Sequence, residues 1–175
     1  MNYRYVFDLD NTLVMTDELN NSSYNYALTQ LGMHPIKTHT RITRDIVFAK
    51  YPNLADFQKN KIIAIKQSYF INHINLTSLN TSLITLLRSK EAAHCILWTS
   101  ADKKRVSALL KYYDLEKRFL KIVYSKKQMI CKDINKICEI FNCSSASLLL
   151  FDNDIKVVKM LKEAGLRVFR LESEV

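Results

Sequence analysis

Three sets of polar side chains directly follow apolar, strand-like runs in the sequence. Asp8 and Asp10 end the run YRYVFDLD, Thr99 follows HCILW, and Asp152 follows SLLLF. In an open parallel sheet, ligands bind outside the carboxyl ends of the strands, near the point where the strand order reverses. We therefore expect these four side chains to gather at one edge of a sheet.

The spacing of Asp8 and Asp10 indicates phosphoryl transfer. Alternate residues at a strand end face the same way, so two carboxylates placed there repel each other unless a cation lies between them. One carboxylate can attack phosphorus while a second acid handles the proton of the leaving group, and a metal ion neutralises charge. Ligation by oxygen alone favours magnesium, so the expected cofactor is Mg²⁺.

The elements that must position these residues alternate between strand and helix in the second half of the chain. Strands are predicted at residues 3–9, 94–98, 120–124, 147–151 and 167–171, and helices at 103–113, 134–141 and 155–164. Repeated strand-helix-strand units require right-handed crossovers and a parallel sheet covered on both faces. The expected fold class is α/β, a doubly wound parallel sheet built from residues 1–15 and 88–175.

Residues 16–87 have a different pattern, because their apolar side chains recur at helical spacing and no strand is evident. Gly32 and Pro35 separate a first helix from a second, and Pro52 separates the second from a third. We expect this segment to form an inserted helical module.

Three motifs resemble those of the haloacid dehalogenase superfamily: VFDLDNTL is similar to its DxDxT signature, ILWTS to its second motif and LLLFDND to its fourth. The resemblance covers essentially the whole chain and implies a Rossmann-like core with a small helical cap. It makes Asp8 the nucleophile and Asp10 the general acid and base, while Thr99 would hydrogen-bond the phosphoryl group. Magnesium would be held by Asp8, Asp152 and the backbone carbonyl of Asp10.

An acid two residues after the nucleophile, as at Asp10, resembles the phosphatase and mutase branch of that superfamily. Hydrolysis is the simpler of the two reactions. The expectation is a magnesium-dependent phosphatase that acts on a small metabolite, a sugar phosphate or nucleotide, through an aspartyl-phosphate. The helical cap would exclude bulk water and select the substrate.

The third motif of the superfamily is a phosphate-binding lysine, and Lys126, Lys127 and Lys132 compete for it. Lys132 is preferred because it stands directly before the helix predicted at residues 134–141, although it lacks the proline that commonly follows. Solvated surface positions are expected for the other two.

The fourth motif is irregular, because Asn153 replaces its usual second acid and Asp154 follows one residue later. Asn153 can ligate a metal ion or hold a metal-bound water. Asp154 is expected to cap the helix that begins at residue 155, a frequent role for aspartate. Thr12 is expected to fix the turn after Asp10, and Trp98 to pack in the core.

The net charge of +9 is concentrated between residues 85 and 132, which hold 12 basic and four acidic side chains. A solvated helix face explains runs such as Lys103-Lys104-Arg105, whereas a phosphorylated polynucleotide end is the second hypothesis for the substrate. Basic and aromatic residues do not interleave there, which weighs against nucleic acid. A phosphoprotein substrate and a non-catalytic binding protein on the same fold are further alternatives.

The sequence points to a cytoplasmic protein without a membrane partner. Aspartates interrupt the apolar stretch that a signal peptide would need at the start, and no window approaches the roughly 18 apolar residues of a membrane span. The cysteines, Cys95, Cys131, Cys138 and Cys143, contain no CxxC pair, so reduced and packed thiols are expected rather than a zinc site.

Overall fold

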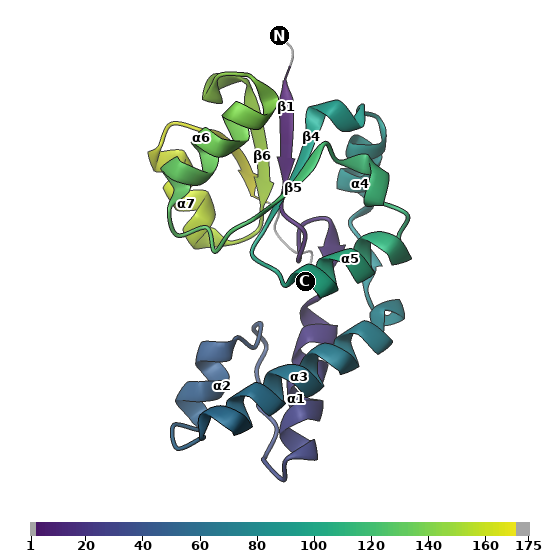
Figure 1. Cartoon of the computed structure of the whole chain (residues 1–175), viewed down its shortest axis with the longest axis vertical. Coiled ribbons are helices and arrows are strands. Elements are labelled where there is room, and N and C mark those ends of the chain that lie inside the picture. The colour runs from purple at the N-terminus through teal and green to yellow at the C-terminus, as the bar shows by residue number, and fades with distance from the viewer. Residues whose placement is uncertain (1–2, 171–175) are drawn as a thin grey trace. The chain divides into compact units, whose positions relative to one another are not determined.

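A computed structural model describes residues 3–170 of the chain (Figure 1). The contacts divide the chain into two compact units: the residues up to Val14 together with those from Leu79 onward, and the inserted segment Met15–Ser78. The first unit carries every residue proposed above for catalysis or metal binding. No helix in the described part of the chain is long and apolar enough to cross a membrane.

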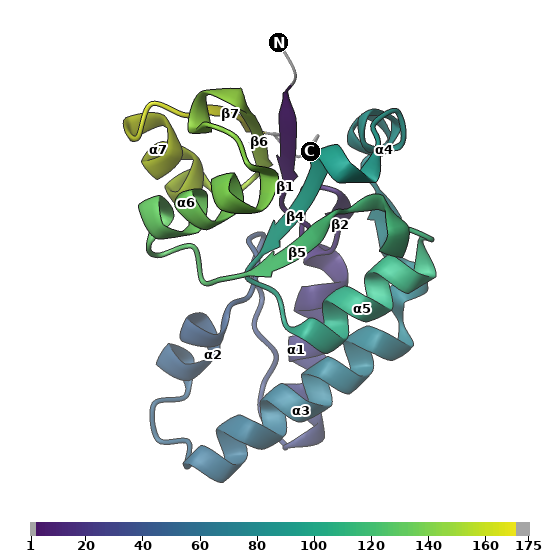
Figure 2. The same cartoon turned by 45° about the horizontal axis from the view of Figure 1, so that its top comes forward.

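The first unit is built on a five-stranded sheet in which every adjacent pair of strands is parallel (Figure 2). The strand order is β5-β4-β1-β6-β7, with bounds β1 Arg4–Phe7, β4 Cys95–Thr99, β5 Lys121–Tyr124, β6 Leu148–Asp152 and β7 Arg167–Arg170. All five predicted strands are present, and the doubly wound α/β fold is confirmed. The last residue of the strand predicted at 167–171 lies outside the described residues.

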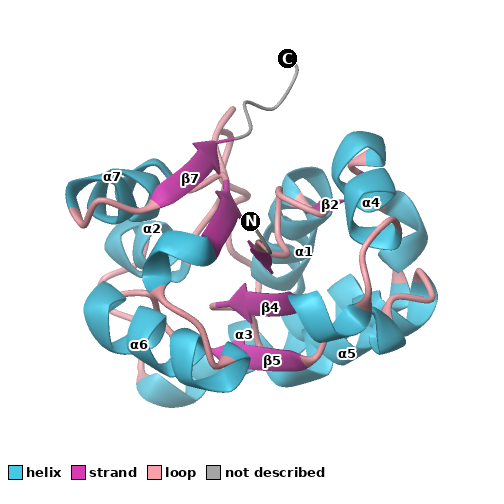
Figure 3. Ribbon diagram, turned by 90° about the horizontal axis from the view of Figure 1, so that it is seen from above, coloured by secondary structure: helices cyan, strands magenta, loops and turns pink. Residues whose placement is uncertain are grey.

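Four α-helices cover this sheet. The pair α6 (Ile130–Phe141) and α7 (Ile155–Glu163) lies on one face, and the pair α4 (Thr81–Arg88) and α5 (Lys103–Tyr112) lies on the other (Figure 3). Short 3₁₀ turns precede three of the strands, at Ala92–His94, Glu116–Arg118 and Ser145–Ser147. His94 therefore lies in a turn rather than at the start of the predicted strand.

Hydrophobic burial fixes the helices on the sheet. Helix α6 places Ile130, Ile134, Ile137 and Phe141 on one face, the spacing of an amphipathic helix, and all four are buried. They pack in a cluster with side chains from the sheet such as Val6, and each such burial contributes about 1.5–3 kcal/mol. One hydrophobic core thus fixes α6 and α7 on the sheet.

The second unit is helical, as the sequence predicts. It contains α1 (Asp17–Gln30), α2 (Arg44–Lys50), α3 (Asp56–Asn72) and a 3₁₀ turn at Ile74–Leu76. Its core contains Tyr24, Ala27, Leu28, Ile36, Ile42, Val47, Leu54 and Ile62.

The boundaries of the insert differ from the prediction at one end. The chain passes between the units at β2 (Val14–Met15) and β3 (Ser78–Leu79), which form a two-stranded sheet. The expected insert ran to residue 87, but α4 belongs to the first unit. Buried Leu83, Ile84 and Leu87 give α4 an apolar face, a feature that a core helix and a cap helix share in sequence.

Candidate active site

The ends of three adjacent strands bring the predicted acids together. From β1 the chain crosses to β4 and β5 on one side and then to β6 and β7 on the other, so the strand order reverses beside β1. Asp8 follows β1, with its backbone N–H donating to Phe151 O at 2.9 Å, while Asp152 ends β6 and Thr99 ends β4. Their exposed fractions are 7% for Asp8, 2% for Asp152 and 1% for Thr99. These three residues thus lie at the carboxyl ends of adjacent strands.

A buried lysine joins two of these acids. Lys127 is only 5% exposed, and its Nζ donates to Asp8 Oδ1 at 2.6 Å and to Asp152 Oδ2 at 2.7 Å. The same ammonium lies 4.8 Å from the centre of the Trp98 ring, an additional cation–π contact. Trp98 packs in the core, as expected, and its ring also contacts the ammonium of this lysine.

The loop after β5 holds Lys127 in an unusual backbone conformation. Lys127 has φ +55°, a left-handed value that costs a non-glycine residue roughly 1–3 kcal/mol. Its backbone N–H donates to Ser125 Oγ at 3.0 Å, and Ser125 Oγ also accepts from Trp98 Nε1 at 3.1 Å and donates to Asp133. These contacts fix the turn that directs the lysine toward the carboxylates.

The preference for Lys132 as the lysine at this site is corrected to Lys127. Helix α6 begins at Ile130 rather than near residue 134, so Lys132 lies within its first turn instead of before it. Its side chain is exposed, and within residues 3–170 it forms no ion pair with Asp8 or Asp152. Lys126 is also exposed.

Asp10 has a different cation as its partner. Its carboxylate forms an ion pair with the guanidinium of Arg105, and both side chains are largely buried. Arg105 comes from the first turn of α5, whose start is fixed by Asp102, an N-cap that accepts from Lys104 N at 2.9 Å. The sequence singled out Arg105 only as part of a basic run.

The loops around the acids are joined by further hydrogen bonds. Thr12 Oγ1 donates to Asn153 Oδ1 at 3.3 Å, which links the first and fourth motifs. Asp154 accepts from Lys156 N and Val157 N, so the predicted helix-capping role is confirmed. The backbone N–H of Asp154 also donates to Asp152 Oδ1 at 2.9 Å, which fixes the second oxygen of that carboxylate.

Burial and neighbouring charges alter the ionisation of this cluster. Burial, opposed by the Lys127 ammonium and assisted by the carboxylates of Asp152 and Asp10, raises the pKa of Asp8 from 3.8 to about 6. For Lys127, burial alone would lower the pKa, but the carboxylates of Asp8 and Asp152 outweigh it and raise the pKa above its ordinary value. The lysine therefore remains a cation near neutral pH, and Asp8 is mostly ionised at pH 7.

The donor set fits a divalent cation that prefers oxygen. Within residues 3–170, no group of three or more His, Cys, Asp and Glu side chains is arranged to hold a metal ion. The carboxylates of Asp8 and Asp152, which share Lys127, nevertheless offer oxygen atoms alone, the ligand type of Mg²⁺. Three carboxylates facing the two cations Lys127 and Arg105 leave one negative charge when all are ionised. A dianionic phosphoryl group would be repelled without a further cation.

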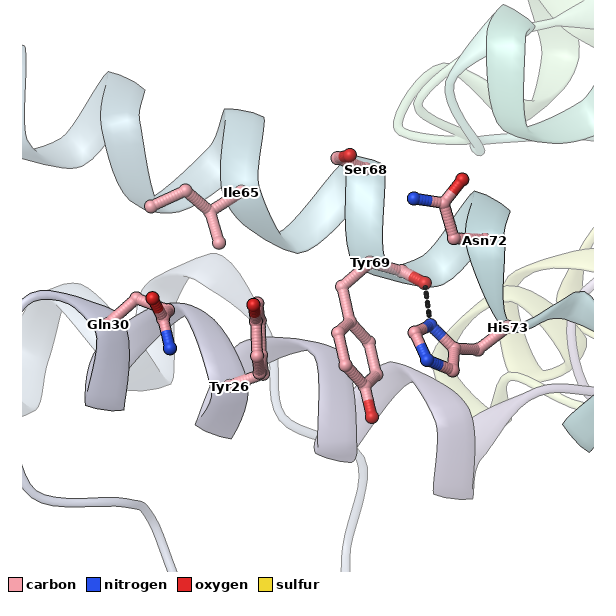
Figure 4. Close-up of a pocket in the computed structure, with 7 residues that line it drawn as sticks. All are labelled: Tyr26, Gln30, Ile65, Ser68, Tyr69, Asn72 and His73. Carbon is pink, nitrogen blue, oxygen red and sulfur yellow. Dashed lines mark hydrogen bonds between the residues drawn. The ribbon is translucent and has the colours of Figure 1, made fainter.

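A separate pocket of about 430 Å³ lies within the second unit, on α1 and α3, and contains none of the predicted site residues. Figure 4 shows the rings of Tyr26, Tyr69 and His73 following one another along the pocket. Ring centres are 4.4 Å apart for Tyr26 and Tyr69 and 3.9 Å apart for Tyr69 and His73, so the three rings are stacked. His73 Nδ1 also lies 2.8 Å from the backbone oxygen of Tyr69, which orients the imidazole.

Solved structures with the same fold were found, whereas no match was found among curated proteins. A HAD hydrolase, family IA, variant 3, from Entamoeba histolytica is 17% identical with a TM-score of 0.80, over 99% of this chain and 85% of that one. CbbY from Rhodobacter sphaeroides in complex with phosphate is 16% identical with a TM-score of 0.80, over 99% and 87%. A HAD-superfamily hydrolase, subfamily IA, variant 1, from Geobacter sulfurreducens is 12% identical with a TM-score of 0.73, over 99% and 88%.

The sequence also matches a family directly. The model of the family described as haloacid dehalogenase-like hydrolase matches residues 5–171, which include all three motifs and the helical insert. The observed fold, with its strand order and its acids at the strand ends, agrees with this match. The chain belongs to the haloacid dehalogenase-like hydrolases.

Proposed function

We propose that this protein is a magnesium-dependent phosphatase that hydrolyses the phosphate monoester of a small metabolite through an aspartyl-phosphate on Asp8. One observation carries the proposal: Lys127 holds the buried carboxylates of Asp8 and Asp152 together at the point where the strand order reverses. A carboxylate in this position can be the nucleophile, because the lysine restrains its orientation and can also bind phosphoryl oxygens.

The reaction has two steps. A carboxylate oxygen of Asp8 attacks phosphorus, the bond to the ester oxygen breaks, and Asp10 in its protonated form gives that oxygen a proton. Asp10, now a carboxylate, takes a proton from water as the water attacks the same phosphorus, which releases phosphate and regenerates Asp8.

Two further side chains would stabilise the phosphoryl oxygens. The Lys127 ammonium supplies positive charge, and the Thr99 hydroxyl supplies a donor, because Thr99 Oγ1 accepts from the backbone N–H of Ala101 at 3.1 Å and keeps its own hydrogen for another acceptor. Asp8, Asp152 and the backbone carbonyl of Asp10 would hold Mg²⁺, which when bound would neutralise charge on the phosphoryl group.

The structural relatives support phosphate chemistry. CbbY, which has the same fold, is known in complex with phosphate, and a mutant of it in complex with xylulose-(1,5)bisphosphate. A small phosphorylated metabolite, a sugar phosphate or a nucleotide, is therefore the substrate class we propose. The helical second unit would serve as the cap that selects this substrate.

The structure weakens the case for a polynucleotide substrate. That hypothesis rested on the basic excess between residues 85 and 132. Two of those cations, Arg105 and Lys127, are buried in ion pairs with the acids of the site, so they do not contribute to a basic surface. A phosphorylated oligonucleotide stays in the test as the competing substrate class.

The proposal is tested by measuring inorganic phosphate release from sugar phosphates, nucleotides and 3′- or 5′-phosphorylated oligonucleotides, with Mg²⁺ and with excess chelator. We expect turnover of at least one small ester that disappears with chelator and returns when Mg²⁺ is restored. A Lys126→Met variant is the control, because Lys126 is exposed and is expected to matter little. Full activity in chelator, or turnover of oligonucleotides alone, would contradict the proposal.

A further inference from the structure

The basic run Lys103-Lys104-Arg105 is divided by the fold. Lys103 and Lys104 are exposed, as expected for a solvated helix face, but Arg105 is buried. A buried guanidinium is costly unless it is paired, and its ion-pair partner here is the carboxylate of Asp10. The side-chain conformations of Arg105 and Asp10 are therefore linked.

The two acids of the first motif have separate cations. Lys127 forms ion pairs with Asp8 and Asp152, while Arg105 forms an ion pair with Asp10. A guanidinium is planar and presents several donors in a fixed geometry, which restrains a carboxylate more closely than an ammonium does. This arrangement allows the nucleophile and the neighbouring acid to be oriented independently.

Arg105 is carried by a rigid part of the fold. It lies in the first turn of α5, which starts at the Asp102 cap and is anchored to the sheet by the buried residues Val106, Leu109 and Leu110. A side chain on such a helix can hold its partner within a fraction of an ångström, more closely than one on a loop.

We propose that Arg105 is a positioning residue that holds the Asp10 carboxyl group in the orientation needed for proton transfer, an inference that rests on the phosphatase function proposed above. Arg105 acts through Asp10 and does not bind the substrate. Its loss should therefore lower kcat and leave KM nearly unchanged. A misplaced acid-base group typically costs about 10- to 100-fold in rate, which is the decrease we expect in kcat for Arg105→Gln.

The variants separate positioning from other roles. Arg105→Lys keeps the positive charge with a less rigid geometry and should retain a kcat between those of wild type and Arg105→Gln. Lys104→Gln is the matched control, because it removes the same charge from an exposed position in the same helical turn and should leave kcat unchanged. Circular dichroism and thermal unfolding show whether each variant folds.

The decisive measurement is a double-mutant cycle with Asp10→Asn, using a phosphate ester that the wild type hydrolyses. If Arg105 acts only through Asp10, then Arg105→Gln should change kcat by less than about twofold in the Asp10→Asn background. Independent, multiplicative losses, or a KM that rises with the Arg105 substitution, would overturn the inference and leave the phosphatase proposal intact. A wild type that releases no phosphate from any ester would overturn both.

Discussion

The Asp8→Asn substitution is expected to stabilise the metal-free protein at pH 7 while it abolishes activity. Asp8 is buried, and burial is the largest of the causes that raise its pKa to about 6. The ionised carboxylate that serves as nucleophile is thus less favourable in the folded protein than in the unfolded chain. A neutral amide of nearly the same shape removes that cost, but it is a poor nucleophile.

The difference between 3.8 and about 6 corresponds to about 3 kcal/mol at 1.36 kcal/mol per pKa unit. Because the folded-state pKa is the higher one, the folded protein binds its proton first as the pH falls. Ionised Asp8 therefore lowers the free energy of unfolding most above pH 6. The wild type recovers this lost stability as the pH falls from 6 to 3.8. We expect a gain of about 1–3 kcal/mol for Asp8→Asn at pH 7, because the amide also weakens the hydrogen bond from Lys127.

Urea denaturation in excess chelator at pH 7 and pH 5 measures this effect. The advantage of Asp8→Asn over wild type should shrink at pH 5, where the folded wild type is largely protonated at Asp8. Asp114→Asn is the control: Asp114 is exposed and has φ +54°, which asparagine also tolerates, so its stability should stay within about 0.5 kcal/mol of wild type. An Asp8→Asn protein that is less stable than wild type at pH 7, or an advantage that grows at pH 5, would refute the reasoning.

Lys127 and the N-cap of α7 are each tested by a pair of substitutions. Lys127→Met should lower the free energy of unfolding by about 3 kcal/mol, because two buried carboxylates lose their cation. It should also reduce kcat about 100-fold or more. Lys132→Met is the control and should change both quantities little, as measured by urea denaturation and steady-state kinetics. Asp154→Ala should cost about 1 kcal/mol by removing the N-cap of α7, and Asp154→Asn, which keeps a capping side chain, should restore most of it in the same denaturation assay.

The sequence predicted the positions that follow directly from strand ends. Asp8, Thr99 and Asp152 each come immediately after a short apolar run, and the rule that parallel strands end at the same edge brought them together without knowledge of the packing. The capping role of Asp154 was equally local, because an aspartate directly before an apolar helical pattern is a common N-cap.

The cations could not be assigned in the same way, because their positions depend on contacts between distant segments. Lys127 reaches the acids because its own backbone is left-handed and hydrogen-bonded to Ser125. A lysine in the sequence gives no signal for that conformation. Helix α6 begins after Met129, which provides no side-chain cap, so the sequence carries no signal for the start of the helix or for the place of Lys132 in it. The pairing of Arg105 with Asp10 brings together residues from distant segments of the chain, and a run of three basic residues is normally solvated.

Phosphorylation of Asp8 is tested most directly by mass spectrometry of the peptide that contains Asp8, after rapid mixing and an acid quench. The Asp10→Asn variant with an activated ester is the best case, because the leaving group needs no proton and the second step lacks its base. We predict an added phosphoryl group on that peptide, present in wild type, accumulated in Asp10→Asn and absent in Asp8→Asn. If no variant carries it, and label from water enters the released phosphate directly in a single turnover, then water rather than Asp8 attacks phosphorus and the account is wrong.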